Sequence, residues 1–122
     1  MKILCSNPKE IFDRRSHEIF SAIAQVVDSG IYINGKNVER FEASFSEFIG
    51  VDYAIGVSSG TSAIELVLKS LNLKQSDEVV TVSHTAVATV SAIKSANLTP
   101  VLADIDPLTY TLCPNSFKKV IT

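Results

Sequence analysis

Apolar side chains recur at helical spacing in residues 1–50. A first run begins after Pro8 and ends at the stop signal Asp28–Gly30, and a second run ends at Gly50. The turn dipeptide Asn34-Gly35 separates the two runs. The apolar face of the second run is made by Val38, Phe41, Phe45 and Phe48. The pattern therefore predicts two amphipathic helices, each needing another surface to cover its apolar face.

Beyond Gly50, short apolar runs alternate with helical segments. In chain order they are "YAIGVS" at 53–58, a helix over 62–71, "EVVTVS" at 78–83, a helix over 85–96 and "PVLADI" at 100–105. The apolar runs are continuous, as in parallel strands that crossover helices bury on both faces. The pattern predicts a β-α-β-α-β segment of an α/β fold, followed by a helix that starts around Ser116.

These patterns divide the chain into a helical N-terminal arm, residues 1–50, and a sheet-forming part, residues 51–122. Three strands with open edges form part of a larger, mostly parallel sheet rather than a finished domain. We therefore expect the chain to be truncated relative to a complete domain.

Composition and charge narrow the function. The chain has 122 residues, a formal charge of −2 and no basic stripe, which argues against nucleic acid and anionic membranes as partners. The opening "MKILC" is too short for the apolar region of a signal peptide, so we expect a cytoplasmic protein. Cys5 and Cys113 are far apart, and His17 and His84 are isolated. This spacing predicts no disulfide and no metal site.

The segment "GVSSGTSAIELVLKSL" joins an apolar run directly to a helix. Gly60–Ala63 lies where the carboxyl end of a predicted strand meets a helix N-terminus, and there the backbone amides and the Thr61 hydroxyl suit a phosphate. The segment Ser62–Glu65 also has the spacing of a capping box, a local helix-start motif that requires no ligand. Local sequence leaves both interpretations open, and the absence of a Walker lysine and of GxGxxG disfavours a nucleotide loop.

The second strand-to-helix junction, "VSHTAVATVSAIKSAN", repeats this arrangement with polar residues Ser83–Thr85. His84 is placed to stack on or hydrogen-bond a planar ligand, or else serves as a surface or capping residue. Thr89 has packing as its simplest role. Asp104 and Asp106 end the last run just before a proline, which favours turn formation over acid-base chemistry.

Taken in order, several motifs resemble the N-terminal part of the DegT/DnrJ/StrS family of pyridoxal-phosphate-dependent sugar aminotransferases. The likeness extends from the first helix to Thr122. The motifs are Gly35-x-x-Val38-x-x-Phe41-Glu42, Ser59-Gly60-Thr61-x-Ala63, Asp77-Glu78-Val79, Thr85-x-x-Ala88-Thr89 and Pro100-Val101 followed by Asp104-Ile105-Asp106.

The resemblance implies the aspartate-aminotransferase (fold type I) architecture, of which this chain supplies the N-terminal arm and the first part of the large domain. It implies that Thr61 and the Ser62 amide, beside Gly60, hold the cofactor phosphate. Family members commonly carry an aromatic residue that stacks on the pyridine ring at the position of Ala86. Here either His84 takes that face or the ring is held less tightly.

Further implications concern the partner subunit and one helix end. Tyr32 lies where family members approach the substrate of the partner subunit, so the complete protein is expected to be a homodimer. The helix end that the family fills with Gly or Asn falls on Asn97, which tolerates the left-handed conformation.

The implied reaction moves an amino group, typically from glutamate, through pyridoxal 5′-phosphate to a nucleotide-linked keto-sugar. This activity would serve cell-surface polysaccharide or lipopolysaccharide synthesis. In the family, the Schiff-base lysine and the aspartate that pairs with the pyridine nitrogen come after the segment seen here, so no catalytic residue is assigned. The alternatives are a non-catalytic fragment or binding module, and a pyridoxal-phosphate-dependent sugar dehydratase.

Overall fold

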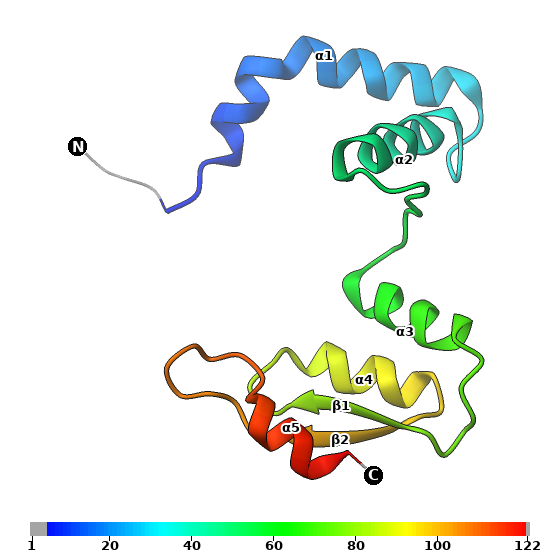
Figure 1. The fold of residues 1–122 in the computed structure, drawn as a ribbon. Helices are drawn as coiled ribbons and strands as arrows, with labels where there is room; N and C mark the ends of the chain where they lie inside the picture. The colour runs from blue at the N-terminus through cyan, green and yellow to red at the C-terminus, as the bar shows by residue number, and fades with distance from the viewer. Residues whose placement is uncertain (1–4, 122) are drawn as a thin grey trace. The chain divides into compact units, whose positions relative to one another are not determined.

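The computed structural model describes residues 5–121. Within that range it contains five helices and two strands (Figure 1). Contacts divide the chain between Gly56 and Val57 into two compact units. The division of the chain into residues 1–50 and 51–122 remains a prediction, and each compact unit is described by itself.

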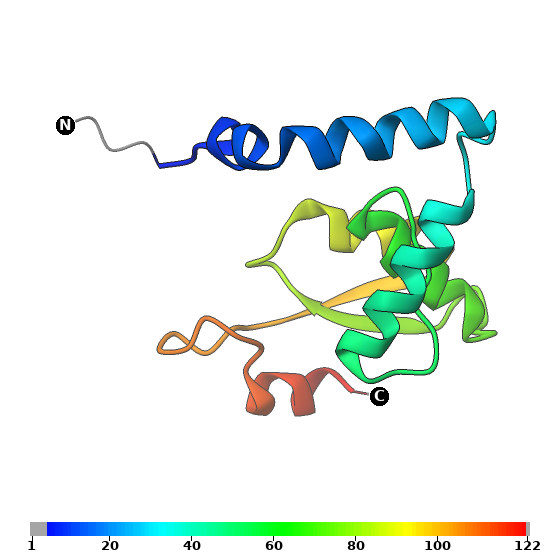
Figure 2. The same ribbon diagram turned by 90° about the horizontal axis from the view of Figure 1, so that it is seen from above.

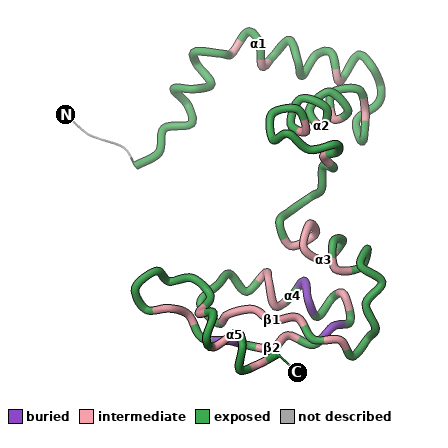
Figure 3. The backbone as a smooth tube through the Cα atoms, in the orientation of Figure 1, coloured by how far each residue is buried: buried purple, intermediate pink, exposed green. Residues whose placement is uncertain are grey.

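The first unit consists of two helices, α1 (Pro8–Ser29) and α2 (Lys36–Ile49), which confirms both helices predicted from the apolar spacing. Each ends at a glycine in the left-handed conformation, Gly30 with φ +67° and Gly50 with φ +78°. This backbone conformation is strained for other residues and relaxed for glycine, so each helix stops there. Neither helix has a buried residue in the part of the chain described (Figure 3).

The second unit contains α3 (Gly60–Ser70), β1 (Glu78–Val82), α4 (Val87–Ser95), β2 (Thr99–Ala103) and α5 (Pro114–Val120). The two strands are parallel and run in register from Glu78 opposite Thr99 to Val82 opposite Ala103. Helix α4 is the crossover between them, and α4 and α5 lie on opposite sides of the sheet (Figure 2). The buried core is small and consists of Ala92, Ile93, Leu98 and Ala103.

The strand that the sequence predicts over 53–58 does not form: among residues 5–121 the sheet has two strands, β1 and β2. A strand exists through backbone pairing, and β1 and β2 pair with each other. In residues 53–58 the amide of Gly56 instead donates a hydrogen bond of 2.6 Å to the carboxylate of Glu42. This segment therefore crosses from the first unit to the second without pairing with the sheet.

The loop after β2 is a compact turn. The Asp106 carboxylate accepts hydrogen bonds from the amides of Leu108 (2.8 Å) and Thr109 (3.2 Å), which confirms the turn-forming role predicted for it. Asn97 takes the left-handed conformation, φ +61°, as expected. Among residues 5–121, no helix combines the length and the apolar character needed to cross a membrane.

Candidate functional site

Helix α3 begins with a complete cap. Ser59 is the N-cap residue, and its hydroxyl accepts a hydrogen bond of 3.1 Å from the Ser62 amide. The Ala63 amide donates to the Ser59 carbonyl at 3.0 Å. The alternative capping box Ser62–Glu65 is wrong, because Ser62 is already the third residue of the helix and Glu65 forms an ion pair with Lys69 instead. The helix therefore starts two residues earlier than predicted.

The cap does not use every hydrogen-bond donor at the start of α3. Within residues 5–121, the amides of Gly60 and Thr61 and the Thr61 hydroxyl have no hydrogen-bond partner. A Cβ placed on Gly60 would meet no described atom within 4 Å. The Ser62 hydroxyl lies 3.0 Å from that of Ser58 and 3.1 Å from that of Ser59. Free amides at a helix N-terminus, with hydroxyls beside them, are suited to an anion.

The Ser62 amide, to which the family resemblance assigns a phosphate contact, has a competing hydrogen bond in this structure. That amide already donates to Ser59. The side-chain hydroxyl of Ser62 remains beside the open turn, within the chain of serine hydroxyls. The donors available to an anion are therefore the Gly60 and Thr61 amides and nearby hydroxyls.

The junction between β1 and α4 is built differently. Ala86 is the N-cap of α4 and offers no side-chain acceptor. The Thr89 amide donates to the Ala86 carbonyl at 3.1 Å, and the hydroxyls of Thr85 and Thr89 are 3.4 Å apart, a long contact for two hydroxyls. Helix α4 starts at Val87, two residues later than predicted. Thr85 and Ala86 consequently lie in the loop in front of the helix.

His84 has an aromatic neighbour that sequence reasoning missed. Its ring centroid lies 6.0 Å from that of Tyr110, at an interplanar angle of 36°. Tyr110 sits in the loop after β2 with φ +57°, held by a hydrogen bond of 2.8 Å from its amide to the Asp106 carbonyl. A left-handed tyrosine has no sequence signal of its own, because Asn and Gly are the residues that favour this region.

The structure brings five of the six predicted site residues to one side of the second unit. Helix α3 packs against α4, and both helices begin on the side toward which the parallel strands run (Figure 1). These residues are Gly60, Thr61 and Ser62 on α3 and His84 and Ala86 before α4. The sixth, Tyr32, belongs to the first unit, where it lines a cavity between α1 and α2 and is 69% exposed. In the described part of the chain, no group of three or more His, Cys, Asp or Glu residues could hold a metal ion.

Comparisons with known proteins identify relatives along most of the chain. A family model described as the DegT/DnrJ/EryC1/StrS aminotransferase family matches residues 13–122. The chain is 36% identical over 114 residues to dTDP-3-amino-3,6-dideoxy-alpha-D-galactopyranose transaminase of Aneurinibacillus thermoaerophilus, covering 93% of this chain and 31% of that protein.

Solved structures show the same likeness. The chain matches S. venezuelae DesV in complex with a ketimine intermediate with a TM-score of 0.89 and 37% identity, covering 95% of this chain and 31% of DesV. It matches E. coli GDP-4-keto-6-deoxy-D-mannose-3-dehydratase with bound hydrated PLP with a TM-score of 0.75 and 29% identity, covering 84% of this chain and 28% of that protein. The chain thus spans about 30% of the length of the relatives that it matches.

Proposed function

The chain belongs to the DegT/DnrJ/EryC1/StrS aminotransferase family, and on that basis we propose that it supplies the N-terminal part of a pyridoxal-phosphate-dependent sugar aminotransferase. The observation that carries the proposal is the α3 turn, where a capped helix start leaves the Gly60 and Thr61 amides open. Its place at the carboxyl side of a parallel sheet is where α/β proteins bind their ligands. Relatives of this chain are named as dTDP-sugar and UDP-sugar aminotransferases, so the proposed acceptor is a nucleotide keto-sugar.

The residues of the α3 turn fit the phosphate of pyridoxal 5′-phosphate. In our proposal the amides of Gly60 and Thr61 and the Thr61 hydroxyl donate to phosphate oxygens, and the Ser62 hydroxyl lies beside them. The dipole of α3 adds a favourable field for the dianion. When bound, the cofactor supplies an electron sink for moving an amino group between donor and keto-sugar. The chain's own part is to anchor and orient the cofactor.

The junction before α4 is proposed to face the cofactor ring. His84 supplies a flat side chain that Tyr110 flanks, and Ala86 leaves room for the ring instead of stacking on it. Tyr32 is proposed to approach the substrate of a partner subunit in a homodimer. Glutamate as donor, a role in cell-surface polysaccharide synthesis and a cytoplasmic location are further proposals, resting on the family resemblance and the sequence.

A sugar dehydratase is the second candidate, because a GDP-sugar dehydratase is among the matched structures. The two activities differ in the product: an aminotransferase installs nitrogen on the sugar, whereas a dehydratase removes water. Both reactions would use the same phosphate turn. The α3 turn therefore supports binding of the cofactor for either reaction. Identifying the product distinguishes the two activities.

The test uses the protein that carries this chain. The absorbance of the bound cofactor's conjugated ring system should be present in the purified protein and should fall on substitution of Thr61→Val. Thr109→Val, in the loop after β2, is the matched control and should keep the absorbance. Mass spectrometry of a nucleotide keto-sugar incubated with ¹⁵N-glutamate should then show incorporated nitrogen. A protein without cofactor absorbance would refute the proposal, and a dehydrated product without nitrogen would select the second candidate.

A further inference from the structure

The loop between β2 and α5, residues 104–113, brings an aromatic side chain to the junction between β1 and α4. Because β1 and β2 are parallel, the loops that follow them leave the sheet on the same side (Figure 1). The ring centroids of Tyr110 in the first loop and His84 in the second are 6.0 Å apart, and the rings are inclined by 36°. This separation falls within the range of attractive aromatic pairs.

The loop has a backbone framework of its own. The Tyr110 amide donates to the Asp106 carbonyl at 2.8 Å, and the Asp106 amide donates to the Thr111 carbonyl at 2.8 Å. At the base of the loop, the Cys113 amide donates to the Asp104 carbonyl at 2.9 Å. None of these bonds uses a side chain. The path of the loop is therefore compatible with residues other than tyrosine at position 110.

Tyr110 has a backbone conformation that a tyrosine does not favour. Its φ is +57°, where a β-carbon crowds the backbone and glycine is relaxed. The other non-glycine residues with positive φ in the described chain are all asparagines, at positions 34, 72 and 97. Burial does not account for the tyrosine, because its side chain is 65% exposed. Strained backbone positions of this kind cluster at functional sites.

The contact between Tyr110 and His84 gives the tyrosine a role. His84 is exposed, and within residues 5–121 its imidazole makes no hydrogen bond or ion pair. An exposed side chain without polar partners exchanges between rotamers. A flanking ring favours the rotamers that keep the two rings in contact. Tyr110 therefore restricts the orientation of the His84 imidazole.

We propose that Tyr110 is a positioning residue whose ring holds the His84 imidazole ready for the cofactor ring. This assignment rests on the proposed function, in which His84 faces the cofactor and Ala86 leaves room for it. A side chain that is already oriented loses less entropy when a ligand binds. Tyr110 thus acts on cofactor affinity through His84 and makes no contact of its own with the cofactor.

The first experiment titrates the cofactor-free form of the protein that carries this chain with pyridoxal 5′-phosphate and follows the cofactor absorbance. Tyr110→Gly should weaken binding about three- to tenfold, whereas Tyr110→Phe, which keeps the ring, should stay within about twofold of the unmodified protein. Asn97→Gly makes the same backbone change after α4 and is the matched control, with unchanged affinity. Unchanged affinity in Tyr110→Gly, or an equal loss in Tyr110→Phe, would overturn the proposal.

A double-mutant cycle tests whether Tyr110 acts through His84. In a protein that already carries His84→Ala, adding Tyr110→Gly should cause no further loss of cofactor affinity, because the imidazole that Tyr110 orients is gone. A further loss as large as that of Tyr110→Gly alone would show that Tyr110 acts independently, for example by shaping the loop. That result would also overturn the proposal.

NMR of the cofactor-free protein tests the contact directly, because an aromatic ring shifts the resonances of protons beside it. Tyr110→Gly should move the His84 ring signals, Tyr110→Phe should keep them close to their original positions, and the signals of His17 on α1 should stay unchanged. Unmoved His84 signals in Tyr110→Gly would contradict the proposal. Absence of cofactor absorbance in the unmodified protein would refute the proposed function itself. Normal cofactor binding that Tyr110→Gly leaves unaffected would refute the role of Tyr110 alone, so the two failures are distinguishable.

Discussion

Helices α3 and α4 are consecutive helices of the second unit and pack together, yet different interactions stabilise them. Helix α3 has a full serine cap at Ser59 and no buried residue within the described chain. Helix α4 has no side-chain cap at Ala86 but buries Ala92 and Ile93. The start of α3 is fixed by hydrogen bonds within a few residues and its side chains are at most half-buried, whereas α4 depends on fully buried contacts across the unit. A ligand can therefore use the α3 start without competing with the core.

The largest expected effect is on the packed helix. Ile93 is 1% exposed, so Ile93→Ala should lower the free energy of unfolding by about 2–5 kcal/mol. The matched change on α3, Ile64→Ala, removes a side chain that is only half-buried and should cost less than Ile93→Ala. Urea denaturation followed by circular dichroism measures both. Comparable losses would mean that α3 is also held by burial.

The capped helix should respond to loss of its cap. Ser59→Ala removes the acceptor of the Ser62 amide, and we expect a loss of about 1 kcal/mol in unfolding free energy. Ser70→Ala is the control, because Ser70 lies at the other end of α3 and bonds the Val67 carbonyl within its own helix. Hydrogen exchange at the Ser62 amide should accelerate in Ser59→Ala alone. Equal effects of the two variants would contradict the role of the cap.

The uncapped helix should gain from an added cap. Ala86 has extended backbone angles, φ −62° and ψ 139°, and a serine there can accept from the first turn of α4. Ala86→Ser should therefore raise the unfolding free energy by about 0.5–1 kcal/mol. Ala86→Val, which adds bulk without an acceptor, is the control and should give no gain. A gain with valine as well would point to packing at this position instead of capping.

The local elements were predictable from sequence, because their signals lie within a few residues. Helical spacing gave the bounds of α1 and α2 closely, and the turn residues Asp106 and Asn97 behave as their chemistry requires. Two serines near the start of α3 were candidate N-caps. Ser59 is the N-cap in the structure, where its backbone is extended and its hydroxyl accepts from the Ser62 amide. The spacing of Ser62 and Glu65 alone could not reveal this.

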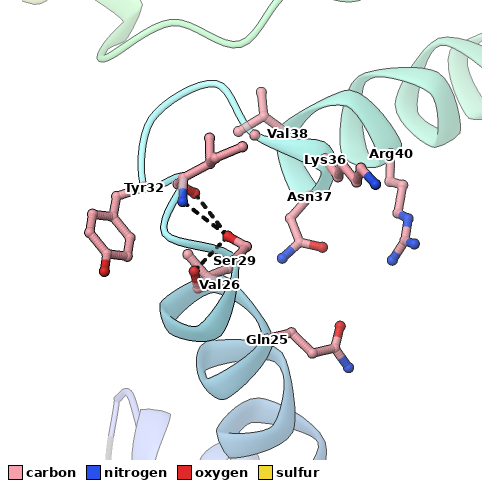
Figure 4. Close-up of a pocket in the computed structure, with 10 residues that line it drawn as sticks. Gln25, Val26, Ser29, Tyr32, Lys36, Asn37, Val38 and Arg40 are labelled. Atoms are coloured by element: carbon pink, nitrogen blue, oxygen red, sulfur yellow. Dashed lines mark hydrogen bonds between the residues drawn. The ribbon is translucent and has the colours of Figure 1, made fainter.

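The rest depends on contacts between distant residues. Residues 53–58 form a strand only if another strand pairs with them. The apolar pattern of the segment does not indicate whether such a partner strand is available. The approach of Tyr110 to His84 depends on the path of a loop 26 positions away along the chain. The cavity between α1 and α2 is lined by residues of both helices, from Gln25 to Arg40, which no local pattern brings together (Figure 4).

The smallest changes in unfolding free energy are expected at the C-terminal ends of α3 and α4. The two helices begin differently, but both are followed by an asparagine in the left-handed conformation, Asn72 with φ +54° and Asn97 with φ +61°. Glycine relaxes this conformation but also increases the entropy of the unfolded chain, so the two contributions nearly cancel. Asn72→Gly and Asn97→Gly should each change the unfolding free energy by less than about 0.5 kcal/mol, and equally, whereas Asn97→Ala should cost about 1 kcal/mol. Urea midpoints of the three variants measure this. A larger loss at Asn97 than at Asn72 would show that the Asn97 side chain, and not its backbone conformation alone, supports the buried helix.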